Sequence, residues 1–289
     1  MKNSLTISLL FTSMLSHAQT NPWSAVSQKQ QQKTQQAGNT IKNWKNHLQC
    51  WGMDSNYNHA LAVGGRLNGN GWSGLVYYQR KINSWQSHFF QLSFSEIRHE
   101  KQVKQERTNK AWPELGSGSP YVFGKINNLY TLQLGHGREF LILPGLLEGN
   151  MNISLRLQAG VALAMLKPYY LKLAYVTYDT TSAVQTAVVQ EEKYSDENAE
   201  KFLNTGYILG ASKWSKGLNE ITYAPGGFAD AAIVIEPLKN KTFIKTVTIG
   251  ANFAFYSKDL TIMAEQKAKP YTATVFVGLS LGKRWAGRN

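Results

Sequence analysis

The chain has 289 residues, a formal net charge of +13 and a hydrophobic content of 43%. Its single cysteine, Cys50, excludes an intrachain disulfide. After the first residues, no segment approaches 18 consecutive apolar residues, so a membrane-spanning helix is not expected. The strands of a membrane β-barrel give a much weaker hydropathy signal, and a barrel therefore remains compatible with this composition.

The N-terminus predicts export. Lys2 provides a short basic start, residues 5–15 form an apolar run, and residues 16–19 offer a small-residue cleavage site. This order is typical of a secretory signal peptide, and the apolar run is too short to span a membrane. We therefore predict a signal peptide at residues 1–18. An exported basic protein meets lipid headgroups and lipopolysaccharide phosphates, so no nucleic-acid partner is expected.

The segment that follows has little to bury. Residues 19–50 are rich in glutamine and carry Lys29, Lys33, Lys42 and Lys45 without an acidic residue. Such a composition favours a flexible or marginally helical segment. We predict a Gln-rich basic periplasmic arm over residues 19–56 and a β-barrel over residues 57–289.

Eight segments after the arm alternate apolar residues with small or polar ones, as strands do. The alternation is strictest in the last, where Val275, Val277 and Leu279 lie on one face and Gly278 and Ser280 on the other. The predicted strands cover about 58–67, 71–80, 87–97, 122–135, 152–165, 227–236, 244–256 and 274–285.

The connections between these strands differ in length. The links near 81–86 and 237–242 are short, whereas those at about 98–121, 166–226 and 257–270 are long. Only the tight first hairpin and the link at about 136–151 depart from a regular alternation. An even number of strands, with short periplasmic turns and long loops outside, is typical of an outer-membrane barrel.

Aromatic residues support a membrane barrel over a soluble barrel or sandwich. Many fall near the ends of predicted strands, where a membrane interface would place them. They include Tyr169, Tyr170, Phe255, Tyr256, Tyr271 and Trp285. We therefore predict an all-β fold, an eight-stranded antiparallel transmembrane β-barrel with long extracellular loops.

Several short stretches resemble an uncharacterised outer-membrane β-barrel family of Bacteroidota, similar to the small PorT-like barrels of that phylum. These stretches are Gly64–Asn68, Gly71–Trp72, Gly124–Tyr130, Leu166–Leu171, Lys216–Glu220, Pro225–Gly226, Phe255–Lys258 and Ile262–Ala264. The resemblance implies the fold and an outer-membrane location. It brings no established activity and no catalytic residue.

One polar cluster suits hydrolytic chemistry. Ser95, His99 and Glu100 lie at the outer end of the third predicted strand, and some outer-membrane barrels are lipid-modifying hydrolases. Ser95 and His99 are roughly 13 Å apart along a strand, at about 3.3 Å per residue, and a nucleophile needs its base within hydrogen-bond reach. We therefore expect a solvated loop entrance near lipopolysaccharide phosphates, and no catalytic, metal or cofactor site.

Two charged residues fall on the predicted lumenal faces of their strands, namely Arg156 and Asp230. The lumen of an eight-stranded barrel is just filled by side chains, and buried charges must pair there. We expect a lumenal ion-pair network, with a gated path for small solutes as the alternative. A general diffusion pore is disfavoured because it needs about sixteen strands or more.

The sequence thus predicts a non-enzymatic protein of the cell outer membrane with a structural, assembly- or secretion-associated, or surface-interaction role. Its expected partners are outer-membrane lipid, lipopolysaccharide and an envelope protein held by the periplasmic arm or the extracellular loops. Two alternatives stay open. One is a narrow channel or transporter for small apolar ligands, and the other is a lipid-modifying hydrolase built around Ser95 and His99.

Overall fold

The structure, a computed structural model, describes residues 57–106, 119–145, 151–178, 185–237 and 242–286. All of them belong to one compact unit, Asn56–Asn289. The predicted signal peptide (1–18) and periplasmic arm (19–56) lie outside the described residues. Within the described ranges, no helix is both long enough and apolar enough to cross a membrane.

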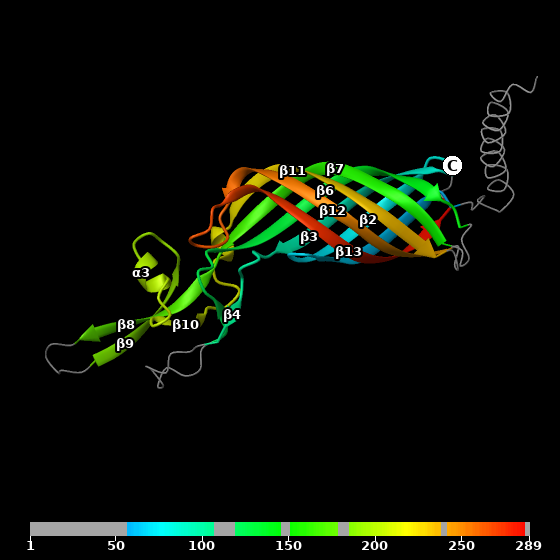
Figure 1. The fold of residues 1–289 in the computed structure, drawn as a ribbon. Coiled ribbons are helices and arrows are strands. Elements are labelled where there is room, and N and C mark those ends of the chain that lie inside the picture. Colours follow the sequence, from blue (N-terminus) through cyan, green and yellow to red (C-terminus); the bar gives the residue numbers. More distant parts are fainter. Residues whose placement is uncertain (1–56, 107–118, 146–150, 179–184, 238–241, 287–289) are drawn as a thin grey trace, which may run out of the picture. The chain divides into compact units, whose positions relative to one another are not determined.

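Eight antiparallel strands close into a barrel in the order β1–β13–β12–β11–β7–β6–β3–β2 (Figure 1). Closure joins the first strand to the last, with His59 opposite Trp285 and Asn68 opposite Phe276. This pairing leaves no barrel strand with a free edge. The predicted all-β, eight-stranded antiparallel barrel is confirmed. Its strands are β1 (His59–Asn68), β2 (Gly71–Lys81), β3 (Gln86–Ile97), β6 (Asn127–Leu143), β7 (Met151–Pro168), β11 (Thr222–Pro237), β12 (Phe243–Leu260) and β13 (Lys269–Trp285).

The alternation in the sequence sets the two faces of the barrel wall. In β13, Val275 and Leu279 are 68% and 65% exposed on the outside, whereas Phe276 and Ser280 are buried inside. Other strands repeat this pattern and together form a continuous apolar outer band, which is the surface that lipid covers in a membrane barrel. The band includes Leu61, Val63, Phe90, Leu92, Phe94, Leu132, Leu134, Leu157, Val161, Ile233, Ile249, Phe253, Val277 and Leu281.

Four strands differ clearly from their predicted bounds. The strand expected at 244–256 is β12, which continues to Leu260, and the strand expected at 274–285 is β13, which begins at Lys269. The strand expected at 122–135 is β6 at Asn127–Leu143, and the strand expected at 227–236 begins earlier, at Thr222. β6 continues because Glu139 faces inward and meets Arg156 of β7. The link after β6 is therefore short, and the predicted irregular connection at 136–151 was wrong.

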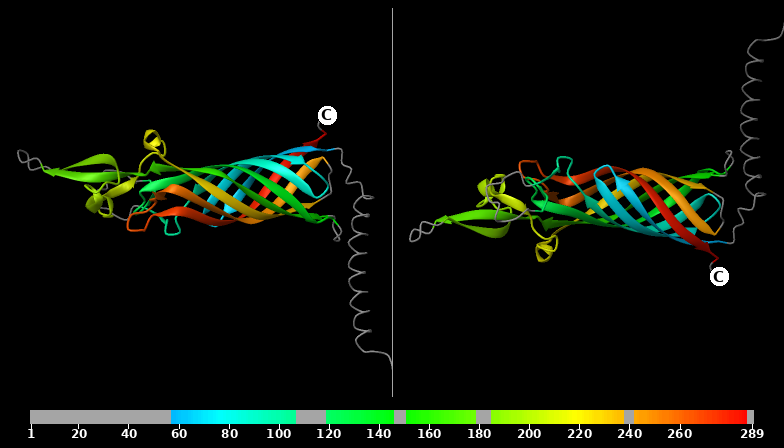
Figure 2. Two further views of the ribbon diagram at one scale, coloured as in Figure 1. Left: turned by 90° about the horizontal axis from the view of Figure 1, so that it is seen from above. Right: turned by 90° about the horizontal axis from the view of Figure 1, so that it is seen from below.

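The two ends of the barrel differ in the length of the connections that they carry. The end where β1 begins and β13 ends, here the terminal end, also carries the short β2–β3, β6–β7 and β11–β12 links. The opposite end, here the loop end, carries the tight β1–β2 turn and the longer connections after β3, β7 and β12. Figure 2 shows the short links gathered at the mouth where the described chain ends.

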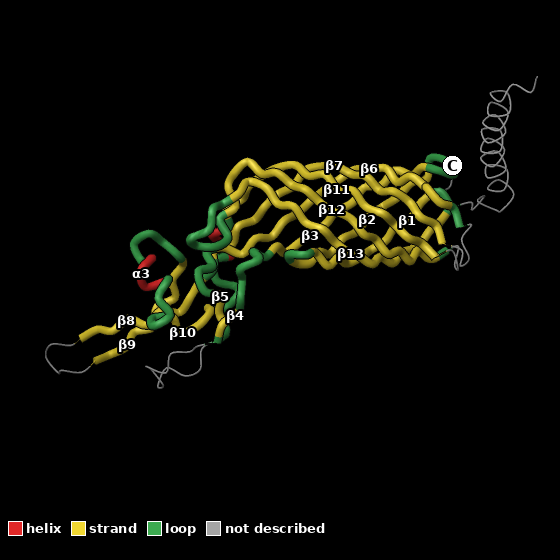
Figure 3. The backbone as a smooth tube through the Cα atoms, viewed as in Figure 1, coloured by secondary structure: helices red, strands yellow, loops and turns green. Residues whose placement is uncertain are grey.

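The connection between β7 and β11 is a structured module rather than a plain loop. We refer to residues 169–221 as the extension. It contains β8 (Tyr170–Tyr178), β9 (Gln185–Lys193), α3 (Ala199–Phe202), β10 (Ile208–Ala211) and the 3₁₀ helix η3 (Leu218–Glu220). β8 is the central strand of a three-stranded sheet, between β10 and β9 (Figure 3).

The extension is built around a small apolar core at the loop end. Leu171, Leu173, Phe202 and Ile208 are buried together with Tyr121. Tyr121 comes from the β3–β6 connection, where β4 (Lys104–Gln105) pairs with β5 (Tyr121–Val122). Two connections that are distant in sequence therefore share one small core at the loop end.

Candidate functional site

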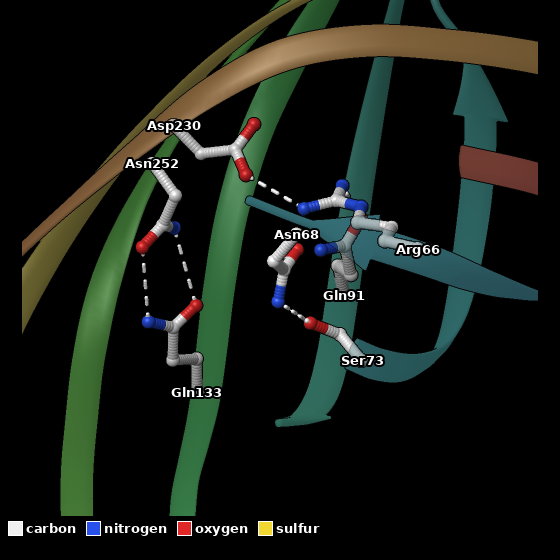
Figure 4. A network of polar contacts seen from close by, with 7 residues as sticks. All are labelled: Arg66, Asn68, Ser73, Gln91, Gln133, Asp230 and Asn252. Atoms are coloured by element: carbon white, nitrogen blue, oxygen red, sulfur yellow. Dashed lines mark hydrogen bonds and ion pairs between the residues drawn. The ribbon is translucent and has the colours of Figure 1, made fainter. Parts of the chain in front are cut away.

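A polar network fills the middle of the barrel lumen. Arg66 Nη1 of β1 donates to Asp230 Oδ2 of β11 at 2.7 Å, and Arg66 Nη2 donates to Gln91 Oε1 of β3 at 3.2 Å. The guanidinium also lies over the Phe276 ring, with its carbon 4.1 Å from the ring centroid. The two hydrogen bonds link β1 to β11 and β3, and Figure 4 shows the Arg66 side chain reaching Asp230.

A second polar contact crosses the lumen nearer the loop end. Gln133 and Asn252 exchange two amide hydrogen bonds of 3.3 Å between β6 and β12. On the neighbouring wall, Asn68 Nδ2 donates to Ser73 Oγ at 2.6 Å (Figure 4). The amide pair spans the interior directly, so side chains occupy the space that a solute path would need.

A third contact lies toward the terminal end. Arg156 Nη2 is 2.6 Å from Glu139 Oε2, and the guanidinium lies over the rings of Tyr77 and Phe89, at 4.5 and 4.9 Å from their centroids. Arg156 is 2% exposed. A desolvated arginine over aromatic rings is stabilised by up to about 2 kcal/mol, in addition to its ion pair.

Apolar side chains close the lumen at the loop end. Ile97, Leu129, Leu166, Tyr256 and Leu260 belong to one buried cluster. Between this cluster and Arg66 lies a small polar pocket with room for about one water molecule, 20 Å³. The pocket is therefore too small for a transported solute.

The two predicted lumenal charges lie inside the barrel but do not meet each other. Arg156 pairs with Glu139, and Asp230 pairs with Arg66. Sequence reasoning missed both partners. Arg66 could have been predicted as a lumenal residue, because it lies on the same, inward face of β1 as Ala60 and Ala62. Glu139 was missed because it lies beyond the predicted end of its strand.

The structure does not bring the predicted hydrolytic cluster together. Ser95 is buried and faces the lumenal pocket. His99 follows the end of β3, and its Nδ1 accepts a hydrogen bond from the backbone N–H of Lys101 at 3.2 Å. Glu100 is exposed. Within the described residues, no group of three or more His, Cys, Asp or Glu side chains could hold a metal ion.

Hydrogen bonds attach the extension to the barrel rim. Lys167 Nζ, at the end of β7, donates to the carbonyl oxygens of Trp214 and Lys216 at 2.5 and 3.1 Å. Trp214 Nε1 donates to Tyr130 Oη on the barrel wall at 3.0 Å. The backbone N–H of Tyr169 donates to the carbonyl of Ile126 at 2.8 Å. The extension is thus fixed to β6 and β7 at its base.

A buried lysine lies beside this attachment and was not identified from the sequence. Lys125 is 7% exposed, and its Nζ lies 5.4 Å from the Tyr169 ring centroid. Burial lowers the pKa of Lys125 to about 8, an effect that Glu96 opposes and that the charges of Arg98, Lys167 and Lys104 reinforce. A run of Gly124, Lys125 and Ile126 before a strand carries no signal that could have predicted this burial.

The comparisons with known proteins concern the fold. No family model matches the sequence, and no curated protein matches it. Similar solved structures include Neisserial surface protein A, at 5% identity and a TM-score of 0.37 over 78% of this chain and 94% of that chain. The attachment invasion locus protein Ail of Yersinia pestis, solved with the heparin analogue sucrose octasulfate, is 9% identical, with a TM-score of 0.35 over 78% and 97%.

A further similar structure is a major outer membrane protein from Thermus thermophilus. It is 7% identical, with a TM-score of 0.38 over 78% of this chain and 99% of that chain. At these identities the likeness is one of fold alone.

Proposed function

We propose that the chain is a non-enzymatic outer-membrane protein whose barrel anchors the extension and presents it to an envelope or surface partner. The observation that carries this proposal is the extension itself. It is built around a small apolar core that Tyr121 of the β3–β6 connection completes, and hydrogen bonds fix its base to the barrel rim. A connection that served only to join β7 to β11 would need neither feature.

The outer-membrane location rests on the exposed apolar band. A soluble protein rarely exposes so much contiguous apolar surface, whereas a bilayer requires it. In this placement the signal peptide directs export, the termini lie in the periplasm and the extension faces outward. Outer-membrane lipid and lipopolysaccharide then contact the wall, and the resemblance to PorT-like barrels of Bacteroidota remains a hypothesis about ancestry.

The other two functions have weaker support. A channel or transporter for small apolar ligands would need free space where Arg66, Asp230, Gln133 and Asn252 cross the lumen. A hydrolase would need Ser95 and a histidine to share a site on the membrane surface, whereas Ser95 faces the lumen.

Affinity purification of the membrane-inserted protein in mild detergent tests the proposal. The full chain should retain a stoichiometric partner, and a variant in which a short Gly-Asn turn replaces residues 171–213 should lose it. The matched control replaces the β12–β13 connection, residues 262–267, in the same way and should keep the partner. Folding of both variants is checked by their resistance to unfolding in cold detergent. A full-length protein without a partner, or a partner that persists without the extension, would contradict the proposal.

A further inference from the structure

A set of basic side chains crosses four adjacent strands at the terminal end of the barrel. His59 lies opposite Arg80, Arg80 opposite His88, and His88 opposite Arg138. His136 lies two residues before Arg138 on β6, in the next position toward the loop end. We refer to these five residues as the basic row.

The basic row lies on the outer face of the barrel. Residues two apart in a strand share a face, so Arg80 lies on the same face of β2 as Tyr78. Tyr77, on the other face, is buried inside the barrel. Arg138 lies on the same face of β6 as Leu134, which is 54% exposed. Both arginines are themselves exposed. Their side chains therefore leave the wall on the same side as the apolar band.

The row lies at the edge of that band. The next outward positions toward the loop end are Tyr78 and Phe90, which lie opposite each other. Beside them, the His59 ring stacks on Tyr78 and on Trp285, at centroid separations of 5.9 and 6.0 Å. Tyrosine and tryptophan gather at the headgroup level of membrane barrels. The basic row is thus at the depth of lipid phosphates.

The described part of the chain supplies no acid to compensate this row. Neither Arg80 nor Arg138 forms an ion pair there, and the neighbouring Glu139 points inward to Arg156. His88 and His136 stack on each other at 5.2 Å between centroids. The guanidinium groups of Arg80 and Arg138, one strand to either side of His88, are like charges, and an anion bound between them would be attracted to both.

The spacing suits one phosphate group. Arg80 and Arg138 lie one strand to either side of His88, and are therefore roughly 10 Å apart at about 4.8 Å per strand. Two long arginine side chains can converge across that distance. Arginine presents a planar set of donors that matches the oxygens of a phosphate.

We propose that Arg80, His88 and Arg138 form a binding site for the phosphate of an anionic glycerophospholipid, whose acyl chains lie along Phe90 and Leu134. A lipid fits better than a soluble anion because the cationic row continues directly into exposed apolar surface, with Phe90 at 55% exposure. The inference rests on the proposed placement of the barrel in a bilayer.

Quenching of tryptophan fluorescence by brominated lipids tests the site. The protein is inserted into vesicles of phosphatidylcholine mixed with phosphatidylglycerol, with bromine on one lipid or the other. The ratio of the two quenching efficiencies gives the relative affinity for the anionic lipid. We expect the wild type to prefer the anionic lipid and Arg80→Gln/Arg138→Gln to lose at least about fivefold of that preference, since each basic residue near the headgroups contributes about fivefold.

The matched control is Lys245→Gln/Lys283→Gln. It removes two exposed outward charges at the same end of the barrel, on β12 and β13, outside the strands that carry Arg80, His88 and Arg138. This variant should keep most of the preference. An equal loss in the control would show general attraction between charges, and an unchanged ratio in the arginine variant would show no site. Either result overturns the proposal.

Two further arms separate the remaining explanations. Quenching by brominated phosphatidylcholine alone reports insertion, so a wild type that it fails to quench contradicts the bilayer placement rather than the lipid site. Addition of inorganic phosphate at about 10 mM should leave the preference intact. Its abolition by free phosphate would assign the site to a soluble anion and overturn the lipid assignment.

Discussion

Arg66 and Asp230 illustrate how single residues hold the lumen together. Both side chains are almost fully buried, and the 2.7 Å contact pairs two charges that are withdrawn from bulk solvent. Loss of one partner of a buried pair leaves an isolated charge and costs about 3–5 kcal/mol, whereas replacing both partners with apolar residues is often close to neutral.

We therefore expect Arg66→Met to lower the free energy of unfolding of the inserted barrel by about 3 kcal/mol. Arg66→Met/Asp230→Leu should recover most of that loss. Arg98→Gln is the control, because its ion pair with Glu96 is exposed and should contribute below about 1 kcal/mol. Urea unfolding in vesicles measures all three. A double variant as unstable as Arg66→Met would show that the pair matters for its geometry rather than for its charge.

Lys125 makes the loop end sensitive to pH. Its pKa of about 8 in the folded protein lies below its ordinary value of 10.5. Between these two pH values the unfolded chain binds more protons than the folded chain, so stability rises with pH across this window. Below pH 8 the buried lysine is charged in both states, and its full burial penalty remains.

We expect the protection of the extension base from proteolysis to increase between pH 7.5 and pH 10 in the wild type. Lys125→Met should be more protected at pH 7.5 and should lose most of that increase. Lys172→Met, on the half-buried face of β8, provides a control that should keep it. A similar pH response in wild type and Lys125→Met would assign the effect to another group.

At the scale of elements, alternation predicted most of the barrel strands but not their pairing. The strand expected at 274–285 forms most of β13. It could be predicted because large apolar residues on its outer face alternate there with mostly small or polar residues on its inner face. β6 was placed too early because His136, Arg138 and Glu139 together resemble a polar loop. Glu139 is recognised as an inward strand residue only when the register is known, because the register places it opposite Arg156. The register depends on the lengths of the links, which cannot be read from the alternation of residues within a strand.

The extension shows the same limit more strongly. Its strands are short, and its core combines residues from β8, α3 and β10 with Tyr121 from another connection. No single segment carries enough apolar periodicity to reveal that assembly, so residues 166–226 were predicted as one long loop. Phe202 is central to the module, since it is fully buried and packs edge-on against Tyr194 at 5.6 Å.

Phe202→Ala should therefore unfold or loosen the extension without affecting the barrel. Truncation of a buried phenylalanine costs about 3–5 kcal/mol, which is large for a module with so small a core. Limited proteolysis should cleave the variant within residues 169–221, while the barrel stays resistant to unfolding in cold detergent. Val188→Ala, at an exposed site on β9, should leave both properties unchanged. Loss of barrel resistance in Phe202→Ala would show that the two parts fold as one unit.

At the scale of the whole barrel, the wall and the lumen are consistent with the proposed anchor and offer no open conduit among the described residues. The outer face offers lipid a continuous apolar band bordered by the basic row. The inner face is occupied from one end to the other, by Arg156 with Glu139, then by the Arg66 network, and finally by the apolar cluster around Leu129. Eight strands leave a lumen that side chains just fill, and here the buried charges of Arg66 and Arg156 are paired within it.

This arrangement predicts that the protein does not conduct ions. In planar bilayers at about 1 M salt, where a water-filled pore of sixteen strands conducts readily, the purified protein should show no discrete current steps. Arg66→Ser/Gln91→Ser removes the side chains that block the middle of the lumen, and it should still conduct far less than such a pore, because the cluster at the loop end remains. A sixteen-stranded diffusion porin, measured in the same bilayer, is the positive control. Reproducible steps from the wild type that scale with protein concentration would show that the lumen opens, and the narrow-channel function would then replace the anchor.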